Sequence, residues 1–367
     1  MKKIRLTSIC SPKQWRTIPT KDLLDEGYPV YGANGVIGYC KEYNHTSDTI
    51  IIGCRGSCGN VNIARGKSYI NGNAMCLDDL SSDVDILYLY YFLQNYDFRS
   101  VISGTTIPQV TKQGLEKIDV VVSSRENQRE IVRQLQLLDS IIEERHKELR
   151  YFDALIKSRF IEMFGDPVTN LKGWTTKPLL DMGNCKNGMN FHAGDSGMEM
   201  HCLGVGDFKD LSFIDGTDHL PVISLNEAPP EESMLRDGDI VFVRSNGNKA
   251  LVGRCLVVYP RSTPTTYSGF CIRYRLTSSE VDTTYLLRVL KTDSMRKKMT
   301  GRGANIQNLN QQILAALDIP LPPIKLQQAF AVFVEQVDKS KFYIVQMQIL
   351  LRLLIRAIQQ KTTEVLL

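Results

Sequence analysis

Two patterns of hydrophobic and polar positions alternate along the chain and divide it into four parts. Residues 1–122 carry short apolar runs separated by turn signals, which is typical of a mixed domain rich in short strands. The clearest signals there are strand candidates at 48–52 and 118–122, a helical stretch at 84–94, and turns at Asn34-Gly35 and Asn71-Gly72.

The second part, residues 123–166, has the pattern of one long helix. No Gly or Pro occurs from Asn127 to Phe164, and apolar residues recur at heptad spacing over about 37 residues, or roughly 55 Å of helix. Gly165-Asp166-Pro167 ends the pattern. The predicted seam runs through Ile131, Leu135, Leu138, Ile142, Arg145, Leu149, Phe152, Ile156, Arg159 and Met163.

Both patterns then return in the same order. Residues 167–323 form a second mixed, β-rich part with strand candidates at 239–243, 256–259 and 270–276, and residues 324–367 form a second helix without Gly or Pro. The second predicted seam runs through Phe330, Val334, Val337, Lys341, Ile344, Gln348, Leu351, Ile355 and Ile358.

The second half also repeats particular residues of the first at an offset of 199 positions, without a gap. Such a repeat indicates two similar modules that face one partner, or two half-sites of one ligand. The offset places Ile107 on Ile306, Gln109 on Asn308, Leu115 on Leu314, Asp119 on Asp318, Gln128 on Gln327 and Asp139 on Asp338.

The two long helices are expected to pack on each other, because a helix with an apolar stripe leaves that stripe exposed when it stands alone in water. The predicted fold class is therefore α+β: two β-rich mixed domains separated by two long helices that pack as a coiled coil, with a pseudo-twofold internal repeat. A structural role as spacers is favoured over a catalytic role for these helices.

Composition narrows the function classes only a little. With 43% hydrophobic and 23% charged residues, the chain reads as a soluble globular protein, and no targeting segment is recognisable. We expect a cytoplasmic protein, because nine scattered cysteines suit free thiols better than a disulfide framework. The cysteine pair Cys54 and Cys58 lacks a second pair, and the five histidines show no metal spacing, so no metal site is predicted.

Four segments carry a family resemblance, and they arrive in order within the doubled architecture: residues 27–35 (GYPVYGANG), 55–60 (RGSCGN), 105–110 (TTIPQV) and 157–167 (KSRFIEMFGDP). The chain resembles, over essentially its whole length, the specificity subunit of Type I restriction-modification enzymes. The first half matches more closely than the second, as expected where recognition domains diverge to read different sequences.

The resemblance implies a DNA-binding subunit without chemistry of its own. Two target recognition domains, 1–122 and 167–323, would each read one half of a split, asymmetric target. The helices, 123–166 and 324–367, would set the spacing and dock two methyltransferase subunits, each modifying an adenine, with two restriction/translocase subunits completing the complex. S-adenosylmethionine, ATP and Mg are then expected on those partners and not on this chain.

The motifs that are absent agree with this role. The chain has no Asn-Pro-Pro-aromatic segment of an adenine methyltransferase, because the pairs Pro229-Pro230 and Pro322-Pro323 follow Ala and Leu. It also has no Gly-x-x-x-x-Gly-Lys-Ser/Thr phosphate loop. Two alternatives stay open: a stand-alone nuclease or methyltransferase with borrowed recognition domains, and a coiled-coil scaffold without a DNA role.

Candidate DNA-binding residues come from Gly-rich turns and from the segments before each helix. Arg can bridge O6 and N7 of guanine, and Asn or Gln can pair with adenine, whereas the bland alternatives are solvated turns and braces of the domain–helix junction. The candidates are Asn34, Arg55, Ser57, Asn60, Thr105, Thr106, Gln109 and Lys112 in the first half, and Arg244, Asn246, Asn248, Lys249, Arg302, Asn305, Gln307 and Asn308 in the second.

Candidate docking and spacer residues are the apolar members of the two seams. They are Leu135, Leu138, Ile142, Leu149, Phe152, Ile156, Val334, Val337, Ile344, Leu351 and Ile355. The sequence names neither the bases read nor the length of the spacer between half-sites.

Overall fold

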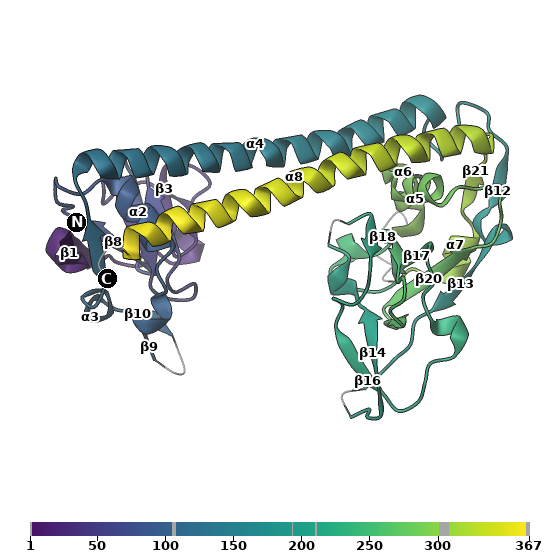
Figure 1. Cartoon of the computed structure of the whole chain (residues 1–367), viewed down its shortest axis with the longest axis horizontal. Coiled ribbons are helices and arrows are strands. Elements are labelled where there is room, and N and C mark those ends of the chain that lie inside the picture. The colour runs from purple at the N-terminus through teal and green to yellow at the C-terminus, as the bar shows by residue number, and fades with distance from the viewer. Residues whose placement is uncertain (1, 105–107, 193, 210, 301–307, 365–367) are drawn as a thin grey trace. The chain divides into compact units, whose positions relative to one another are not determined.

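The computed structural model of the chain describes residues 2–104, 108–192, 194–209, 211–300 and 308–364, and for 361–364 only the backbone (Figure 1). It divides into two compact units. The first unit contains Met1–Glu148 together with Ile344–Leu367, and the second contains Leu149–Tyr343. The division falls within both long helices, so each helix is described below with the unit to which its segment belongs.

The first unit is built from short, mainly antiparallel strands and a few short helices. A four-stranded sheet has the order β2-β8-β5-β6, a three-stranded sheet has the order β4-β3-β7, and β1-β11 and β9-β10 form separate pairs. Its elements are β1 (Lys2–Arg5), α1 (Leu6–Ile9), β2 (Ser11–Gln14), β3 (Tyr28–Gly32), β4 (Gly35–Cys40), β5 (Thr49–Gly53), β6 (Val61–Ala64), β7 (Tyr69–Ile70), β8 (Ala74–Asp78), α2 (Ile86–Gln94), β9 (Ile102–Ser103), β10 (Gln109–Val110), α3 (Lys112–Leu115) and β11 (Asp119–Val122).

The second unit repeats this plan with one more strand in its largest sheet. A five-stranded sheet has the order β13-β20-β17-β18-β15, a three-stranded sheet has the order β16-β14-β19, and β12 pairs with β21. Its elements are β12 (Thr176–Pro178), β13 (Gly183–Asn187), β14 (Met198–Leu203), β15 (Phe213–Asp215), β16 (Val222–Leu225), β17 (Asp239–Val243), β18 (Cys255–Tyr259), β19 (Thr265–Tyr267), β20 (Cys271–Leu276), α5 (Thr283–Lys291), α6 (Asp293–Thr300), α7 (Gln311–Ala315) and β21 (Asp318–Pro320).

These elements confirm the strand, helix and turn predictions within a residue or two. Every residue of β5 and of β17 is buried, as expected for central strands that read as continuous apolar runs. Asn34 lies in the connection between β3 and β4, and Gly35, the first residue of β4, has a φ of +104°, which glycine adopts without strain. The internal repeat is confirmed too, since β2-β8-β5-β6 and β13-β20-β17-β18 occupy equivalent places.

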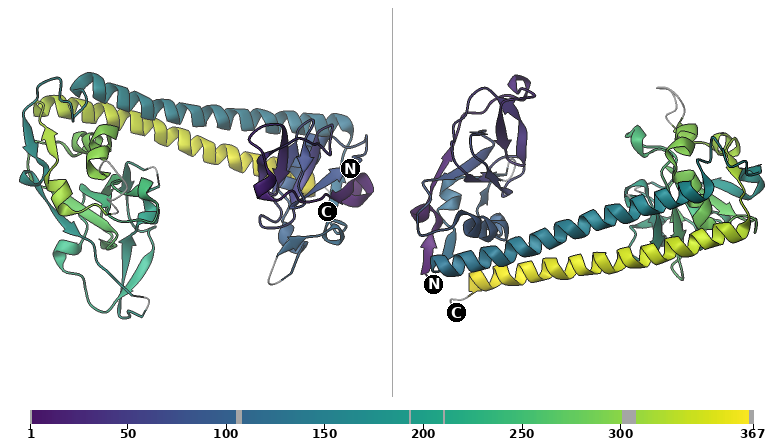
Figure 2. Two further views of the ribbon diagram at one scale, coloured as in Figure 1. Left: turned by 180° about the vertical axis from the view of Figure 1, so that it is seen from behind. Right: turned by 90° about the horizontal axis from the view of Figure 1, so that it is seen from above.

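The two long helices are α4 (Arg125–Phe164) and α8 (Ile324–Glu364). In the second unit they pack antiparallel: the Phe330 ring lies 5.6 Å from that of Phe160 and 5.5 Å from that of Phe164, and Lys341 Nζ lies 2.6 Å from Asp153 Oδ1. In the first unit, the remaining segments of both helices lie side by side in the views of Figures 1 and 2.

The predicted seams are confirmed except at one end. Leu135, Leu138, Ile156, Val334, Val337 and Ile344 are buried, and Ile142, Leu149, Phe152, Leu351 and Ile355 are half-buried. Arg159 is exposed, however, and Phe160 and Phe164 are buried in its place. A straight helix turns every 3.6 residues, so a strict 3.5-residue seam drifts off the buried face along its length.

Helix α8 is more apolar on average than its short continuous apolar runs suggest. Over Ile324–Gln360, α8 is long and apolar enough to cross a membrane by length and composition alone. Several of its apolar side chains, including Phe330, Val334, Val337 and Ile344, are nevertheless buried within the protein. All nine cysteines are free thiols, as the sequence predicts.

A buried glutamine attaches each long helix to its domain, at the pair of positions that the 199-residue offset aligns. In the first unit, Gln128 Oε1 accepts the Asp85 N–H (2.7 Å), and its Nε2 donates to the carbonyls of Asp83 (2.9 Å) and Ser123 (2.8 Å). Asp85 in turn caps α2 by accepting the N–H groups of Leu87 and Tyr88.

The second unit has the same three hydrogen bonds, and we call this arrangement of a buried glutamine in each unit the glutamine bracket. Gln327 Oε1 accepts the Asp282 N–H (2.9 Å), and its Nε2 donates to the carbonyls of Glu280 (3.1 Å) and Pro322 (2.8 Å). Asp282 caps α5. Both glutamines are fully buried, so these hydrogen bonds replace all contact of the amides with water.

Replacing Gln128 with Met should lower the free energy of unfolding by about 3 kcal/mol, because one backbone N–H and two carbonyls lose their partner in a buried place. Urea denaturation of the full chain measures this loss. Gln134→Met on the exposed face of the same helix is the control and should change stability by less than about 0.5 kcal/mol. Equal effects of the two substitutions would contradict the bracket.

Candidate nucleic-acid interface

In the first unit, the Gly-rich turn that follows β5 presents Arg55 to solvent. The turn closes on itself, since Gly53 N–H donates to the Asn60 carbonyl (2.7 Å) and Gly59 N–H to the Gly53 carbonyl (2.9 Å). Gly59 has a φ of +84°, and a Cβ there would approach the Phe98 side chain to 2.8 Å. A residue with a side chain would therefore be strained at this position.

The segment before the spacer helix is fastened to this turn. Arg55 and Gln109 form a β-bridge, the Val110 N–H donates to the Cys54 carbonyl (3.1 Å), and the Cys58 thiol donates to the Pro108 carbonyl (3.1 Å). Arg55 and Gln109, which are separate candidates in the sequence, thus belong to one surface. Burial raises the pKa of the Cys54 thiol, which suits a packed residue and not a reactive one.

The other candidates of the first unit surround this bridge in part. Asn60 Nδ2 donates to Asn34 Oδ1, which joins the turn to the β3–β4 connection, and Lys112 is exposed on α3. Ser57 is half-buried within the turn. Thr105 and Thr106 lie outside the described residues.

The second unit has an equivalent surface after β17. Ser245 and Asn308 form a β-bridge, and the Leu309 N–H donates to the Arg244 carbonyl (2.8 Å). The bridge therefore places Ser245, and not Arg244, at the position of Arg55. The Arg244 guanidinium donates to the Gly269 carbonyl (3.2 Å), so this side chain braces the turn.

Two of the remaining candidates also shape the turn after β17. Asn246 Oδ1 accepts the Asn248 N–H (2.8 Å), and Asn248 Oδ1 accepts the Ala250 N–H (3.0 Å). Lys249 is exposed in the following helical turn. Arg302, Asn305 and Gln307 lie outside the described residues. Ser245 was not among the sequence candidates, because the segment between β17 and β18 is longer than that between β5 and β6 and spacing alone does not align the two.

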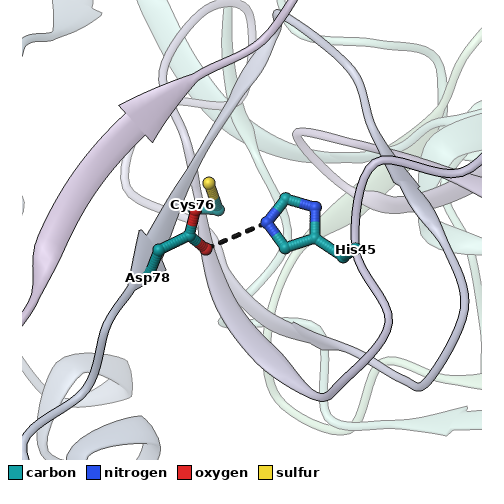
Figure 3. Close-up of side chains that lie close together, drawn as sticks. All are labelled: His45, Cys76 and Asp78. Atoms are coloured by element: carbon teal, nitrogen blue, oxygen red, sulfur yellow. Dashed lines mark hydrogen bonds and ion pairs between the residues drawn. The ribbon is translucent and has the colours of Figure 1, made fainter.

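One group of side chains in the described chain has the composition of a metal site (Figure 3). Donor atoms of His45, Cys76 and Asp78 lie within 4.8 Å of one another. Protein contacts already satisfy them: His45 lies between Asn44 Oδ1 (2.7 Å) and Asp78 Oδ1 (2.9 Å), and the Cys76 thiol donates to the Lys13 carbonyl (3.2 Å).

The charges around this group favour an ion pair over a metal site. Lys13 Nζ lies 3.5 Å from Asp78 Oδ2 and would oppose a second cation. Burial, with a smaller contribution from Asp78, raises the pKa of the Cys76 thiol to about 12, so this thiol keeps its proton. We interpret the group as a tie between the loop at His45 and strand β8.

Comparison with known proteins agrees with the doubled arrangement. A family model described as Type I restriction modification DNA specificity domain matches residues 1–150 and 231–353. The Type I restriction enzyme StySPI specificity subunit of Salmonella potsdam is 26% identical over 273 residues, which cover 68% of this chain and 58% of that protein. The MjaVIII specificity subunit of Methanocaldococcus jannaschii is 23% identical over 296 residues, which cover 74% of this chain and 68% of that protein.

Solved structures share the fold. The S subunit of a Type I restriction-modification system from M. genitalium matches with a TM-score of 0.55 and 17% identity, over 98% of this chain and 95% of that one. A chain from a study of complex assembly and conformational transition of the type I R-M system matches with a TM-score of 0.60 and 17% identity, over 98% and 97%.

The alignment with the Salmonella protein spans less than two thirds of that protein's length, whereas the two solved chains align over nearly their full length. The family model covers well over half of this chain and reaches into both units and both long helices. The protein therefore belongs to the family of Type I restriction modification DNA specificity domains.

Proposed function

We propose that this chain is the sequence-specific DNA-binding subunit of a Type I restriction-modification complex and reads a split, asymmetric target. Each β-rich domain contacts one half-site through the surface at its β-bridge. Family membership supports this proposal, and so do the names of the relatives.

One structural observation carries the proposal: the same bridged surface occurs in both units with different side chains. Arg55 and Gln109 in the first unit stand where Ser245 and Asn308 stand in the second. A repeated backbone with changed side chains suits a protein that reads two different short sequences. A protein-binding scaffold would not require different residues at the same bridged positions of the two units.

We further propose that this chain is not catalytic and that its partners supply the chemistry. Two methyltransferase subunits would bring S-adenosylmethionine, and two restriction/translocase subunits would use ATP and Mg. The absence of a phosphate loop and of a methyltransferase segment from the full sequence supports this division of labour. Such a complex acts on cellular DNA, which favours the cytoplasm.

The long helices would dock the methyltransferases, with side chains other than the predicted ones. The apolar members of the two seams are buried or half-buried inside the chain. Large apolar side chains remain exposed on α8, among them Tyr343 (70%), Leu350 (66%) and Leu353 (53%). Exposed apolar side chains at this density mark interaction surfaces. Helix length would then set the spacing between half-sites.

Methylated adenines mapped across the source genome, with and without this gene, test the function directly. Loss of one split, asymmetric motif on deletion is the expected result, because the chain chooses the target for its methyltransferase partners. If no motif changes, the reconstituted complex should be assayed for DNA retention at several salt concentrations. If the complex retains no DNA at low salt, the proposed function fails and the coiled-coil scaffold without a DNA role is favoured.

Arg55→Ala should weaken binding of the reconstituted complex to its target by about 1–3 kcal/mol, the value of one lost bidentate contact to guanine. The loss should concentrate at one base pair of one half-site. Arg99→Ala is the matched control, because Arg99 is also exposed in the first unit and pairs with its neighbour Asp97. A uniform loss across all sequences would assign Arg55 to phosphate contact instead.

Leu350→Glu should disrupt the complex with the methyltransferase at least tenfold without lowering the thermal stability of the chain, because it adds a charge to an exposed apolar surface. Quantitative co-purification of the reconstituted subunits measures this. Leu171→Glu, at a leucine that is 90% exposed and remote from the helix surface in sequence, is the matched control. Unchanged co-purification of Leu350→Glu would move the docking surface elsewhere.

A further inference from the structure

A third position joins the bridged surface in each unit, and sequence reasoning did not single it out. In the first unit, the N–H groups of Cys54 and Arg55 both donate to the Asn73 carbonyl, at 2.9 and 3.3 Å. Asn73 directly precedes β8, and its own side chain is exposed.

The same pair of hydrogen bonds occurs in the second unit. The N–H groups of Arg244 and Ser245 both donate to the Phe270 carbonyl, at 2.8 and 3.3 Å. Phe270 directly precedes β20, the equivalent of β8, and its side chain is 61% exposed. Asn73 and Phe270 therefore occupy the same place in two copies of one backbone arrangement.

With the bridges already described, each unit has a trio of exposed or half-buried residues on three chain segments that hydrogen bonds join. The trio of the first unit is Arg55, Asn73 and Gln109, and that of the second is Ser245, Phe270 and Asn308. The residues that follow the last two members of each trio are Ala74, Val110, Cys271 and Leu309, and all four are buried. Buried neighbours fix the backbone beneath each trio, which is what a precise recognition surface needs.

We propose that the two trios are equivalent base-reading sets and that Asn73 and Phe270 are specificity-determining residues, one for each half-site. This inference rests on the proposed function. It treats Arg55 and Ser245 as equivalent positions, as the two β-bridges place them.

The chemistry of the trios predicts different targets. Arg55, Asn73 and Gln109 are all hydrogen-bonding side chains, which suits the purine edges of guanine and adenine in the major groove. Phe270 has no hydrogen-bonding group, so at the same place it would make an apolar contact with the methyl group of thymine. Asn308 beside it suits adenine, so the second half-site should be richer in A·T pairs.

An exposed phenylalanine is by itself ordinary on a protein surface. The carrying observation is its place: its carbonyl accepts the same two consecutive N–H groups as that of Asn73, on the edge of the same bridge.

The test is selection from a random DNA library with the reconstituted complex, for the unaltered protein and for Asn73→Ala and Phe270→Ala separately. The unaltered complex should select a split motif. Each substitution should relax about one base pair, with roughly a tenfold loss of preference, and the two should affect opposite half-sites. Total DNA affinity at low salt, which phosphate contacts dominate, should hold for both variants.

Phe213→Ala is the matched control, because Phe213 is another exposed phenylalanine of the second unit and lies on β15. It should leave the selected motif unchanged. If the unaltered complex selects a split motif but Asn73→Ala and Phe270→Ala leave it intact, or both alter the same half-site, the inference fails and the proposed function stands. If the unaltered complex selects no motif, both fail. If Asn73→Ala or Phe270→Ala unfolds, it is replaced by Asn73→Ser or Phe270→Leu, whose side chains are closer in size to the original ones.

Discussion

The rest of the structure depends on one interaction, the buried amide of a glutamine near the start of each long helix. A primary amide offers one acceptor oxygen and two donor hydrogens, and both Gln128 and Gln327 use all three on backbone groups of the adjoining domain. Because an unpaired polar group at a buried position is costly, the amide permits one position of the helix start relative to the capped helix beside it. A buried tyrosine adds a further bond in each unit, from Tyr88 to the Val121 carbonyl and from Tyr285 to the Pro320 carbonyl.

The repeat preserves this framework while the side chains around it change. In the first unit, the Tyr91 hydroxyl donates to Asp139 Oδ2 at 2.7 Å. In the second unit, Asp338 stands at the aligned position and interacts with the Arg288 guanidinium. Burial raises the pKa of the Asp338 carboxyl and lowers that of Arg288, and their attraction opposes both shifts. The features that the two units share are thus mainly contacts of a side chain with backbone groups, and the features that differ are contacts between side chains.

This division explains how far the sequence could be read. Periodicity found β5, β17 and both long helices, because burial of apolar side chains dictates the pattern there. The alignment of Gln128 with Gln327 was also visible, since both positions require a side chain that makes the same three hydrogen bonds. The exposure of Arg159 was missed because heptad spacing drifts on a straight helix. The shift between Arg55 and Ser245, and the group formed by His45, Cys76 and Asp78, depend on loop paths and strand pairing that spacing does not encode.

The discontinuous composition of the first unit has a consequence for how the protein is made. That unit includes the segment of α8 that begins at Ile344, and a buried hydrogen bond runs from Gln359 Nε2 to the Tyr91 carbonyl, 268 positions earlier. A ribosome therefore releases every residue of the second unit before it finishes the first, although the first began to emerge earlier. Until the helical turn around Gln359 is synthesised, the Tyr91 carbonyl of α2 lacks this partner and the first unit is incomplete. Loss of the helical turn around Gln359 would therefore affect the domain at the start of the chain before the domain that adjoins it in sequence.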